Sequence, residues 1–204
     1  MVIHDETVNR TTNGKGNVTQ MSLDQVRALD AGRWFHPCYA GLKVPTLEEV
    51  FRLVKERRRT AAPIALNMKK LSPGIEEKIV KLVERYGLLE CVFAFDMPAE
   101  SARRFKKANP KIRTCGSAGT PEQMKALIDD PLFDDVWIRF IPAEEDVKRA
   151  HDRGKRIWLW DWALPAGPKL WDLCNQARKV GLDGICTDHP LEVREMWMGK
   201  GRPR

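Results

Sequence analysis

The stretch VWIRFIPAEEDVKRAHDRGKRIWLW, residues 136–160, decides the fold class of this chain. It begins with a short apolar run, Val136 to Phe140, and ends with a second one, Ile157 to Trp160. Between them, Ala143 to Arg153 carry apolar side chains at helical spacing and charged side chains elsewhere. A strand, a helix and a strand in this order predict a βα unit whose next strand runs parallel to the first.

The same alternation recurs from position 63 onward and gives six strands in all. The other strands are expected at Ile64 to Met68, Cys91 to Phe95, Lys111 to Cys115 and Gly184 to Thr187, and the other helices from Pro73 and at Ser101 to Ala108, Pro121 to Ile128 and Lys169 to Val180. Consecutive parallel strands joined by crossover helices are right-handed. They build either an open doubly wound sheet or a closed barrel.

The first sixty residues do not follow this repeat. Residues 6–45 are rich in Thr, Asn and Gly and lack sustained periodicity, which indicates a long functional insertion loop. A helix is expected to follow, with Thr46 as its cap, and to end near Arg59. Val2 and Ile3 are expected to be the end of an earlier strand.

We therefore expect an α/β fold, a TIM-type (β/α)8 barrel that is incomplete at its N-terminus. The first strand, the first helix and most of the second strand would be missing, since 204 residues fall short of the roughly 250 typical of this barrel. Residues 1–198 are expected to form a single barrel domain that includes the 6–45 insertion loop. Residues 199–204 are expected to be a disordered basic tail.

Composition excludes several classes of protein. With 43% apolar and 31% charged residues, the chain is typical of ordinary globular proteins. Its apolar runs are far shorter than the roughly 18 residues of a transmembrane span, and its five cysteines form no Cys-x-x-Cys pair, so a reducing cytoplasm is the expected location. The net charge of +7 is spread over helix faces among acidic residues, and we expect no nucleic-acid binding.

In a barrel of this kind, the active site is assembled at the C-terminal ends of the strands. That rule selects a few polar and aromatic groups as candidates. They are His4-Asp5, Asn67-Met68-Lys69, Asp96, Trp160-Asp161 and Thr187 to Pro190.

Four blocks of sequence, taken in order, resemble the glycerophosphodiester phosphodiesterase family. They are HDETVNRTTNGKG at 4–16, LDAG at 29–32, VPTLEE at 44–49 and LDGICTDHP at 182–190. No single block is specific, but their order and spacing together span nearly the whole chain. The resemblance implies metal-assisted hydrolysis of a small-molecule glycerophosphodiester to an alcohol and glycerol 3-phosphate, with a place in lipid metabolism.

The resemblance also implies roles for His4 and Lys69, and Arg10 is a further candidate from the insertion loop. His4 would be one of two histidines that act as acid and base, a role that suits an imidazole near neutral pH; by itself it would be taken for a histidine of a surface loop. Lys69 would hold a phosphate oxygen, unless it is a solvated lysine beside Lys70. Arg10 would contact phosphate from the insertion loop or else stabilise a turn.

A divalent cation, Mg²⁺ or Ca²⁺, is implied for the complete enzyme. The family takes its second histidine and most of its metal-binding carboxylates from His-Arg-Gly, Glu-Asn and Glu-x-Asp blocks that this sequence lacks. Asn67 stands where the family has a Glu; it would bind the cation more weakly or merely end a buried strand. We expect the chain to be inactive as it stands, and about forty to fifty upstream residues to restore activity unless Asn67 marks a true loss.

Trp160 matches an aromatic residue that the family places at the end of strand seven, where a flat wall can pack against glycerol. Trp158 and Trp162 share its face of the strand and Ile157 and Leu159 take the other, so Trp160 is either a ligand contact or plain core. Two other functions stay open. One is a non-catalytic barrel that binds phosphodiesters or a protein partner, and the other is a basic nucleic-acid binder.

Overall fold

The computed structural model describes residues 1–57, 62–69, 72, 74–160 and 167–198. The chain divides into two compact units, residues 1–61 and residues 62–204, and each is described by itself. The expectation of one domain over residues 1–198 stays a prediction. The expected tail, residues 199–204, lies outside the described residues.

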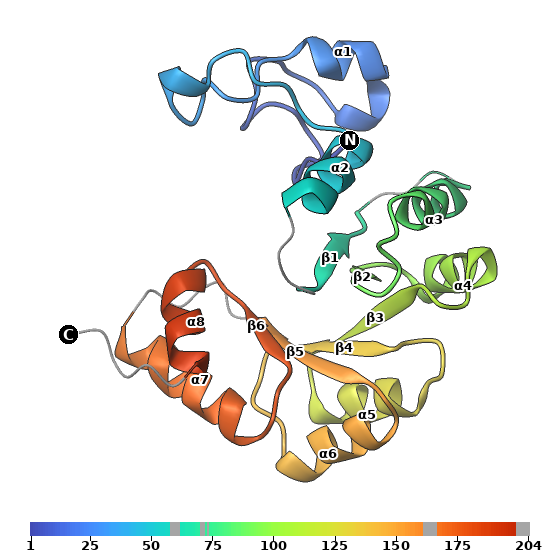
Figure 1. The fold of residues 1–204 in the computed structure, drawn as a ribbon, viewed down its shortest axis with the longest axis vertical. Coiled ribbons are helices and arrows are strands. Elements are labelled where there is room, and N and C mark those ends of the chain that lie inside the picture. The colour runs from blue at the N-terminus through green and yellow to red at the C-terminus, as the bar shows by residue number, and fades with distance from the viewer. Residues whose placement is uncertain (58–61, 70–71, 73, 161–166, 199–204) are drawn as a thin grey trace. The chain divides into compact units, whose positions relative to one another are not determined.

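The second unit is a sheet of six parallel strands in chain order with helices along its outer side, a curled half-barrel (Figure 1). The expected α/β barrel class is thereby confirmed. The strands are β1 (Ile64–Asn67), β2 (Val92–Phe95), β3 (Arg113–Ala118), β4 (Asp135–Ile138), β5 (Arg156–Trp160) and β6 (Gly184–Cys186). The helices are α3 (Ile75–Arg85), α4 (Ala99–Ala108), α5 (Pro121–Asp129), α6 (Glu144–Asp152), α7 (Pro168–Lys179) and α8 (Pro190–Trp197).

All six strands expected from the sequence are present, but β3 reaches three residues further than predicted. Gly116 and Ser117 are poor strand formers, which is why the prediction ended at Cys115. Packing explains the extension, because a Cβ atom on Gly116 would lie 2.6 Å from a methyl carbon of Leu127. The glycine lets α5 lie close against β3.

The two faces of the sheet carry different cores. Val136, Ile138, Ile157 and Leu159 pack outward against the helices. On the inner face, Trp158 and Trp160 join a cluster whose buried members are Phe93, Phe95, Cys115 and Trp137. The predicted division of β5 into an aromatic face and an aliphatic face is confirmed for residues 157–160; Trp162 lies outside the described residues.

A buried charge cluster underlies the inner face near the start of the strands. Asp135 is fully buried and accepts hydrogen bonds from Arg113 and Arg156, at 2.8 to 3.0 Å. Burial raises the pKa of Asp135, but hydrogen bonds from the two guanidinium groups outweigh burial and hold this pKa below its usual value. The carboxylate therefore stays charged and joins three neighbouring strands.

Within residues 1–57, the first unit contains two α-helices, α1 (Leu23–Ala28) and α2 (Leu47–Arg57), and two 3₁₀ turns, η1 (Val18–Gln20) and η2 (Pro37–Tyr39). Thr46 caps α2 as predicted: its hydroxyl accepts from the Glu49 N–H, and the Glu49 carboxylate accepts from the Thr46 N–H. Val2 and Ile3 are not in a strand, so that prediction is wrong. The Val2 N–H donates to the Pro45 carbonyl at 2.9 Å instead of to a neighbouring strand.

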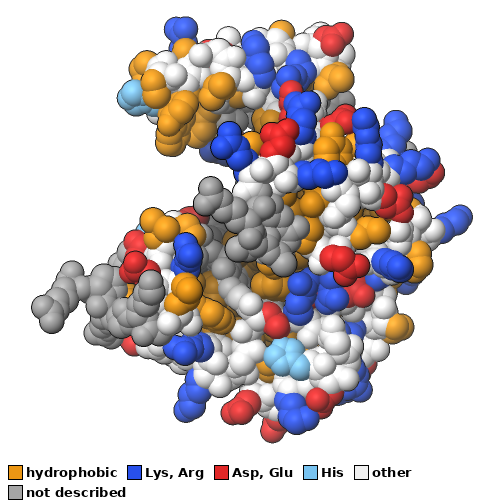
Figure 2. All heavy atoms as spheres, in the orientation of Figure 1, with side chains coloured by type: hydrophobic (Ala, Val, Ile, Leu, Met, Phe, Trp, Pro, Cys, Tyr) orange, Lys and Arg blue, Asp and Glu red, His pale blue; other side chains and the backbone are white. Residues whose placement is uncertain are grey.

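The exposed surface carries dispersed charges and one group of aromatic side chains. On the face seen in Figure 2, Lys and Arg side chains are spread out and interspersed with Asp and Glu. In the first unit, Trp34, Phe35 and Tyr39 are 50%, 69% and 45% exposed and contact one another through their rings. Among the helices of the described residues, none combines the length and the apolar character that crossing a membrane requires.

Candidate functional site

Because the strands of the second unit are parallel, their C-terminal ends meet at one edge of the sheet. Lys69 follows β1 and Asp96 follows β2, and the register Asn67 to Phe95 places these two strand ends side by side. The Lys69 ammonium donates to the Asp96 carboxylate at 3.1 Å, and both side chains remain over 40% exposed. The charge of Lys69 is thus already shared with a neighbouring carboxylate.

Asp96 has a left-handed backbone, with φ of +62°. Among the described residues it is the only one other than glycine with a positive φ. This conformation costs an L-residue roughly 1–2 kcal/mol, although Asp tolerates it better than most. Such a conformation turns the chain sharply at the end of β2 and fixes the direction of the Asp96 side chain.

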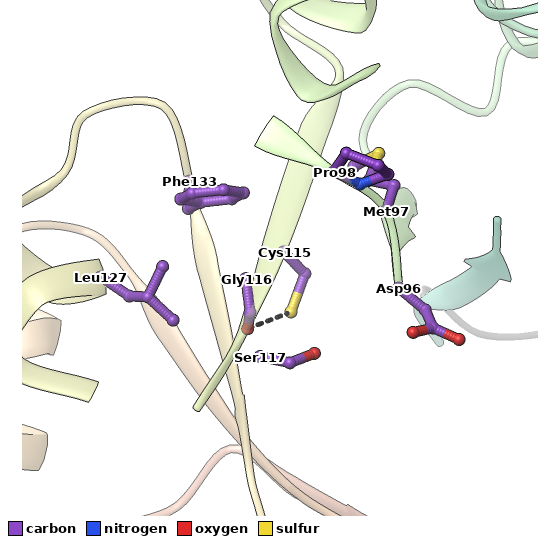
Figure 3. A pocket seen from close by; sticks show the side chains of 8 residues that line it. All are labelled: Asp96, Met97, Pro98, Cys115, Gly116, Ser117, Leu127 and Phe133. Atoms are coloured by element: carbon purple, nitrogen blue, oxygen red, sulfur yellow. Dashed lines mark hydrogen bonds between the residues drawn. The ribbon is translucent and has the colours of Figure 1, made fainter. Parts of the chain in front are cut away.

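A hollow of about 430 Å³ adjoins Asp96, where β2 and β3 diverge. The two strands pair only at Phe93 with Arg113 and at Ala94 with Thr114. Figure 3 shows the Ser117 hydroxyl directed toward the side on which Asp96 lies. The full lining is Asp96, Met97, Pro98, Cys115, Gly116, Ser117, Leu127 and Phe133.

Cys115 lines the same hollow but is not a suitable nucleophile. Its thiol is buried and donates weakly to the Gly116 carbonyl, with sulfur and oxygen 3.6 Å apart. Burial raises the pKa of the Cys115 thiol well above its usual value. The thiol is therefore protonated at neutral pH, whereas nucleophilic attack requires the thiolate.

Asn67 is the residue predicted as a doubtful metal ligand. Its Oδ1 atom is buried and accepts no hydrogen bond, so this oxygen would be available to an ion or a water. The surroundings do not suit a divalent cation, because Lys69 lies two residues away and the Asp96 carboxylate already pairs with it. The described part of the chain has no group of three or more His, Cys, Asp and Glu side chains that could hold a metal. One amide oxygen is far from the six or more oxygen ligands that Ca²⁺ or Mg²⁺ takes.

Trp160 ends β5 on the inner face of the half-barrel. Its ring meets that of Trp137 edge to face, with centroids 5.8 Å apart. The guanidinium carbon of Arg139 lies 4.5 Å from the Trp160 ring centroid, a cation–π contact. Sequence reasoning did not select Arg139, although a single charge at the end of an otherwise apolar strand was a signal that could have found it.

In the first unit, Asp5 bridges His4 and Arg10. The His4 Nδ1 and Asp5 Oδ1 atoms are 2.8 Å apart, and Arg10 donates through Nε and Nη2 to the same carboxylate at 2.7 and 2.9 Å. The hydrogen bonds from Arg10, and then that from His4, hold the pKa of Asp5 far below its usual value. An ionised carboxylate can only accept, so Nδ1 is the donor and a neutral His4 keeps its lone pair on Nε2.

The predicted site residues thus form two groups. His4 and Arg10 meet at Asp5 within the first unit, and Asn67, Lys69 and Trp160 lie on strand ends of the second unit. Arg10 donates hydrogen bonds to Asp5 within its own segment. Both predicted roles of Arg10, contact with phosphate and stabilisation of a turn, stay predictions. Asp161, another candidate from the sequence, lies outside the described residues.

Comparison with known proteins identifies one family that matches nearly the whole chain. A family model described as "Glycerophosphoryl diester phosphodiesterase family" matches residues 1–192. The glycerophosphodiester phosphodiesterase of Caldanaerobacter subterraneus subsp. tengcongensis is 33% identical over 195 residues, which cover 93% of this chain and 76% of that protein. The enzyme of the same name from Bacillus altitudinis is 32% identical over 211 residues, covering 95% of this chain and 80% of that protein.

Solved structures agree on the fold. A glycerophosphodiester phosphodiesterase from Agrobacterium tumefaciens superposes with a TM-score of 0.73 at 21% identity, covering 97% of this chain and 79% of that one. A phosphodiesterase from Oleispira antarctica, solved in complex with its product sn-glycerol-3-phosphate, gives 0.72 at 19% identity and covers 95% and 77% of the two chains. At these identities the likeness concerns the fold.

Proposed function

The chain belongs to the glycerophosphoryl diester phosphodiesterase family, and from this premise we propose that it acts in the hydrolysis of a glycerophosphodiester to an alcohol and glycerol 3-phosphate. The observation that carries the proposal is the His4–Asp5 pair, which lies inside the segment matched to the family. The solved relative from Oleispira antarctica, bound to sn-glycerol-3-phosphate, supports the class of product.

His4 is the proposed acid–base group. Its Nε2 lone pair takes a proton from the attacking group while Asp5 stabilises the imidazolium that forms, and the imidazolium can later give that proton to the departing alkoxide. Arg10 keeps Asp5 ionised, so the pair retains the tautomer that the proton transfer needs. The His4 side chain is 75% exposed, which leaves it accessible to a substrate.

Binding of the substrate is proposed for the strand-end edge of the second unit. Lys69 presents an ammonium group suited to a phosphate oxygen, with Asp96 holding it in place. The flat ring of Trp160 forms a wall against which the glycerol carbons can pack. The proposed role of Arg10 is to position Asp5, and its proposed contact with phosphate is secondary.

Metal dependence is general in this family, and we propose that the reaction uses a divalent cation, Mg²⁺ or Ca²⁺. Asn67 is the proposed ligand on this chain, and its amide oxygen would bind the cation more weakly than a Glu carboxylate. Since the described residues do not form a divalent-cation site, no step is assigned to the ion, and the chain by itself is proposed to have little or no activity. We further propose a cytoplasmic location, a role in lipid metabolism and no nucleic-acid partner; the dispersed charges in Figure 2 support the last point.

The experiment that tests this function combines binding and turnover. We would measure calorimetric binding of sn-glycerol 3-phosphate, and hydrolysis of glycerophosphocholine and bis(4-nitrophenyl) phosphate with Mg²⁺ or Ca²⁺. His4→Asn is compared with His36→Asn, a change to another exposed histidine of the same unit, which contacts Cys38 instead of a carboxylate. Turnover is measured in the chain itself and in a chain extended upstream with the family's His-Arg-Gly and Glu-x-Asp blocks.

We expect the product to bind and the extended chain to be active. His4→Asn should lower turnover by about a hundredfold or more, the usual contribution of a general acid or base, and His36→Asn should leave it unchanged. Absence of product binding in the 204-residue chain, together with absence of turnover in the extended chain, would refute the function. Rapid turnover by the 204-residue chain would support the function and refute the expected inactivity.

A second function, a non-catalytic barrel that binds a phosphodiester or a protein partner, is favoured by one observation. The exposed rings of Trp34, Phe35 and Tyr39 form a contiguous apolar surface of the kind that protein partners cover. Product binding without any turnover in the extended chain would select this alternative.

A further inference from the structure

Arg139 is placed by its strand on the inner face of the half-barrel. Val136 and Ile138 of β4 pack outward against the helices, and Trp137 lies in the inner cluster. Side chains alternate along a strand, so Arg139, the residue after β4, falls on the same side as Trp137. It therefore lies at the edge where an active site of this fold is assembled.

An aromatic stack holds the Arg139 side chain in position. Its guanidinium carbon lies 4.5 Å from the centroid of the Trp160 ring. Trp160 in turn contacts Trp137, which stacks on Phe95 with centroids 4.7 Å apart and planes 8° apart. A guanidinium laid against a ring keeps the donors on its edge for a second partner.

The charge of Arg139 has no anionic partner in the described part of the chain. Other cations on the inner face or near the candidate site have one: Lys69 pairs with Asp96, and Arg113 and Arg156 both pair with Asp135. Arg139 is exposed, and its guanidinium lies against the ring of Trp160. An oriented guanidinium at this edge, without a carboxylate partner among the described residues, favours an anion with two or more oxygens.

We propose that Arg139, held by Trp160, is a substrate-binding residue that contacts the phosphoryl group. This inference rests on the proposed function, because it names a phosphate ligand at the same edge. Arg139 would make the main contact with the phosphate. Lys69 would contribute less, because Asp96 partly neutralises its ammonium group. Phosphate oxygens match the two-pronged donor edge of a guanidinium better than they match a single ammonium.

The test compares Arg139→Gln with a matched control, Arg85→Gln. Arg85 also forms a cation–π contact, with Tyr86 at 5.9 Å, but it lies at the end of α3 before β2 begins, away from the C-terminal ends of the strands. Both variants lose one positive charge and one ring contact. Binding of inorganic phosphate and of sn-glycerol 3-phosphate is measured by calorimetry at several salt concentrations, and folding is checked by circular dichroism.

We expect Arg139→Gln to weaken binding of both ligands at least tenfold and Arg85→Gln to change it less than twofold. Arg139→Lys should recover part of the affinity, because it restores the charge but not the planar donor edge. Equal losses in the two glutamine variants, or no loss in Arg139→Gln, would overturn the inference and leave the proposed function standing. Lack of binding by the unmodified chain would also overturn it, and only a simultaneous lack of turnover in the extended chain would refute the proposed function.

Discussion

Replacing Asp135 by Asn should destabilise the second unit strongly. The carboxylate is fully buried and accepts four hydrogen bonds, two from Arg113 and two from Arg156. An amide keeps one acceptor oxygen, so two of these donors would face an NH₂ group, and two guanidinium groups would lose their counter-charge. Breaking a buried ion pair by removing one partner costs about 3–5 kcal/mol.

Solvent access places the expected loss at the lower end of this range. Arg113 and Arg156 retain 26% and 27% exposure, so water can partly solvate them after the change. We expect a loss of about 3 kcal/mol, which at 2–4 °C per kcal/mol lowers Tm by roughly 6–12 °C. Total stabilities are only about 5–15 kcal/mol, so the effect is easily measured.

The assay is urea and thermal unfolding followed by circular dichroism, with Asp152→Asn as the control. Asp152 accepts from Lys148 in an exposed pair on α6, and its loss should cost less than about 0.5 kcal/mol. A Tm of the Asp135 variant within 2 °C of the unmodified protein would refute the reasoning.

The pH dependence gives a second check on Asp135. Its pKa is lower in the folded state than in the unfolded state, so the unfolded state binds more protons and the charged carboxylate stabilises the fold. This contribution is complete above the unfolded pKa of about 3.9 and is lost as pH falls through the lower folded pKa. The difference in stability between the unmodified protein and Asp135→Asn should therefore shrink below about pH 4.

Three further substitutions test separate parts of the structure. Gly116→Ala should cost roughly 1–3 kcal/mol in urea unfolding, because the new methyl group would lie 2.6 Å from a carbon of Leu127. Arg10→Gln should raise the pKa of Asp5 toward its ordinary value of about 3.9, measured by NMR titration of the carboxyl carbon. Asn67→Glu should increase calorimetric affinity for Ca²⁺ or Mg²⁺ on the order of tenfold, because it supplies the charge that the amide lacks.

Each of these substitutions has its own control and contradicting result. Gly119→Ala meets only a side-chain oxygen of Gln123 at 3.4 Å and should be nearly neutral, so equal losses at both glycines would contradict the packing argument. An unchanged titration of Asp5 would show that Arg10 does not set its charge. Asn175→Glu, at an exposed position of α7, controls for added charge, and equal gains at both asparagines would exclude a specific cation site at Asn67.

The strands and helices of the second unit could be predicted because each depends on a local pattern. Alternation along β5 separated Trp158 and Trp160 from Ile157 and Leu159, and the structure keeps that separation. Val2 and Ile3 were misassigned because two apolar residues carry no periodicity, and a strand exists only where a neighbour supplies its hydrogen bonds.

The candidate site was less accessible to sequence reasoning. His4, Asp5 and Arg10 lie within seven residues of one another, so their motif was visible, whereas the contact of Lys69 with Asp96 spans 27 positions and depends on the register of β1 with β2. Arg139 was missed because its importance depends on the ring of Trp160 and on the lack of a carboxylate partner among the residues that the structure describes. Neither can be read from the order of residues.

The staggered pairing of β3 has a consequence for how the sheet opens. Arg113 and Thr114 pair with β2, and residues 115–118 pair with β4. The Thr114 carbonyl, which accepts from the Asp134 N–H at 2.8 Å, links the two parts. The strand pairing of β3 therefore changes from β2 at its start to β4 over the rest of the strand. Two cooperative unfolding units should then exchange their amide hydrogens at different opening free energies. One consists of β1, β2 and the start of β3, and the other of the rest of β3 with β4, β5 and β6.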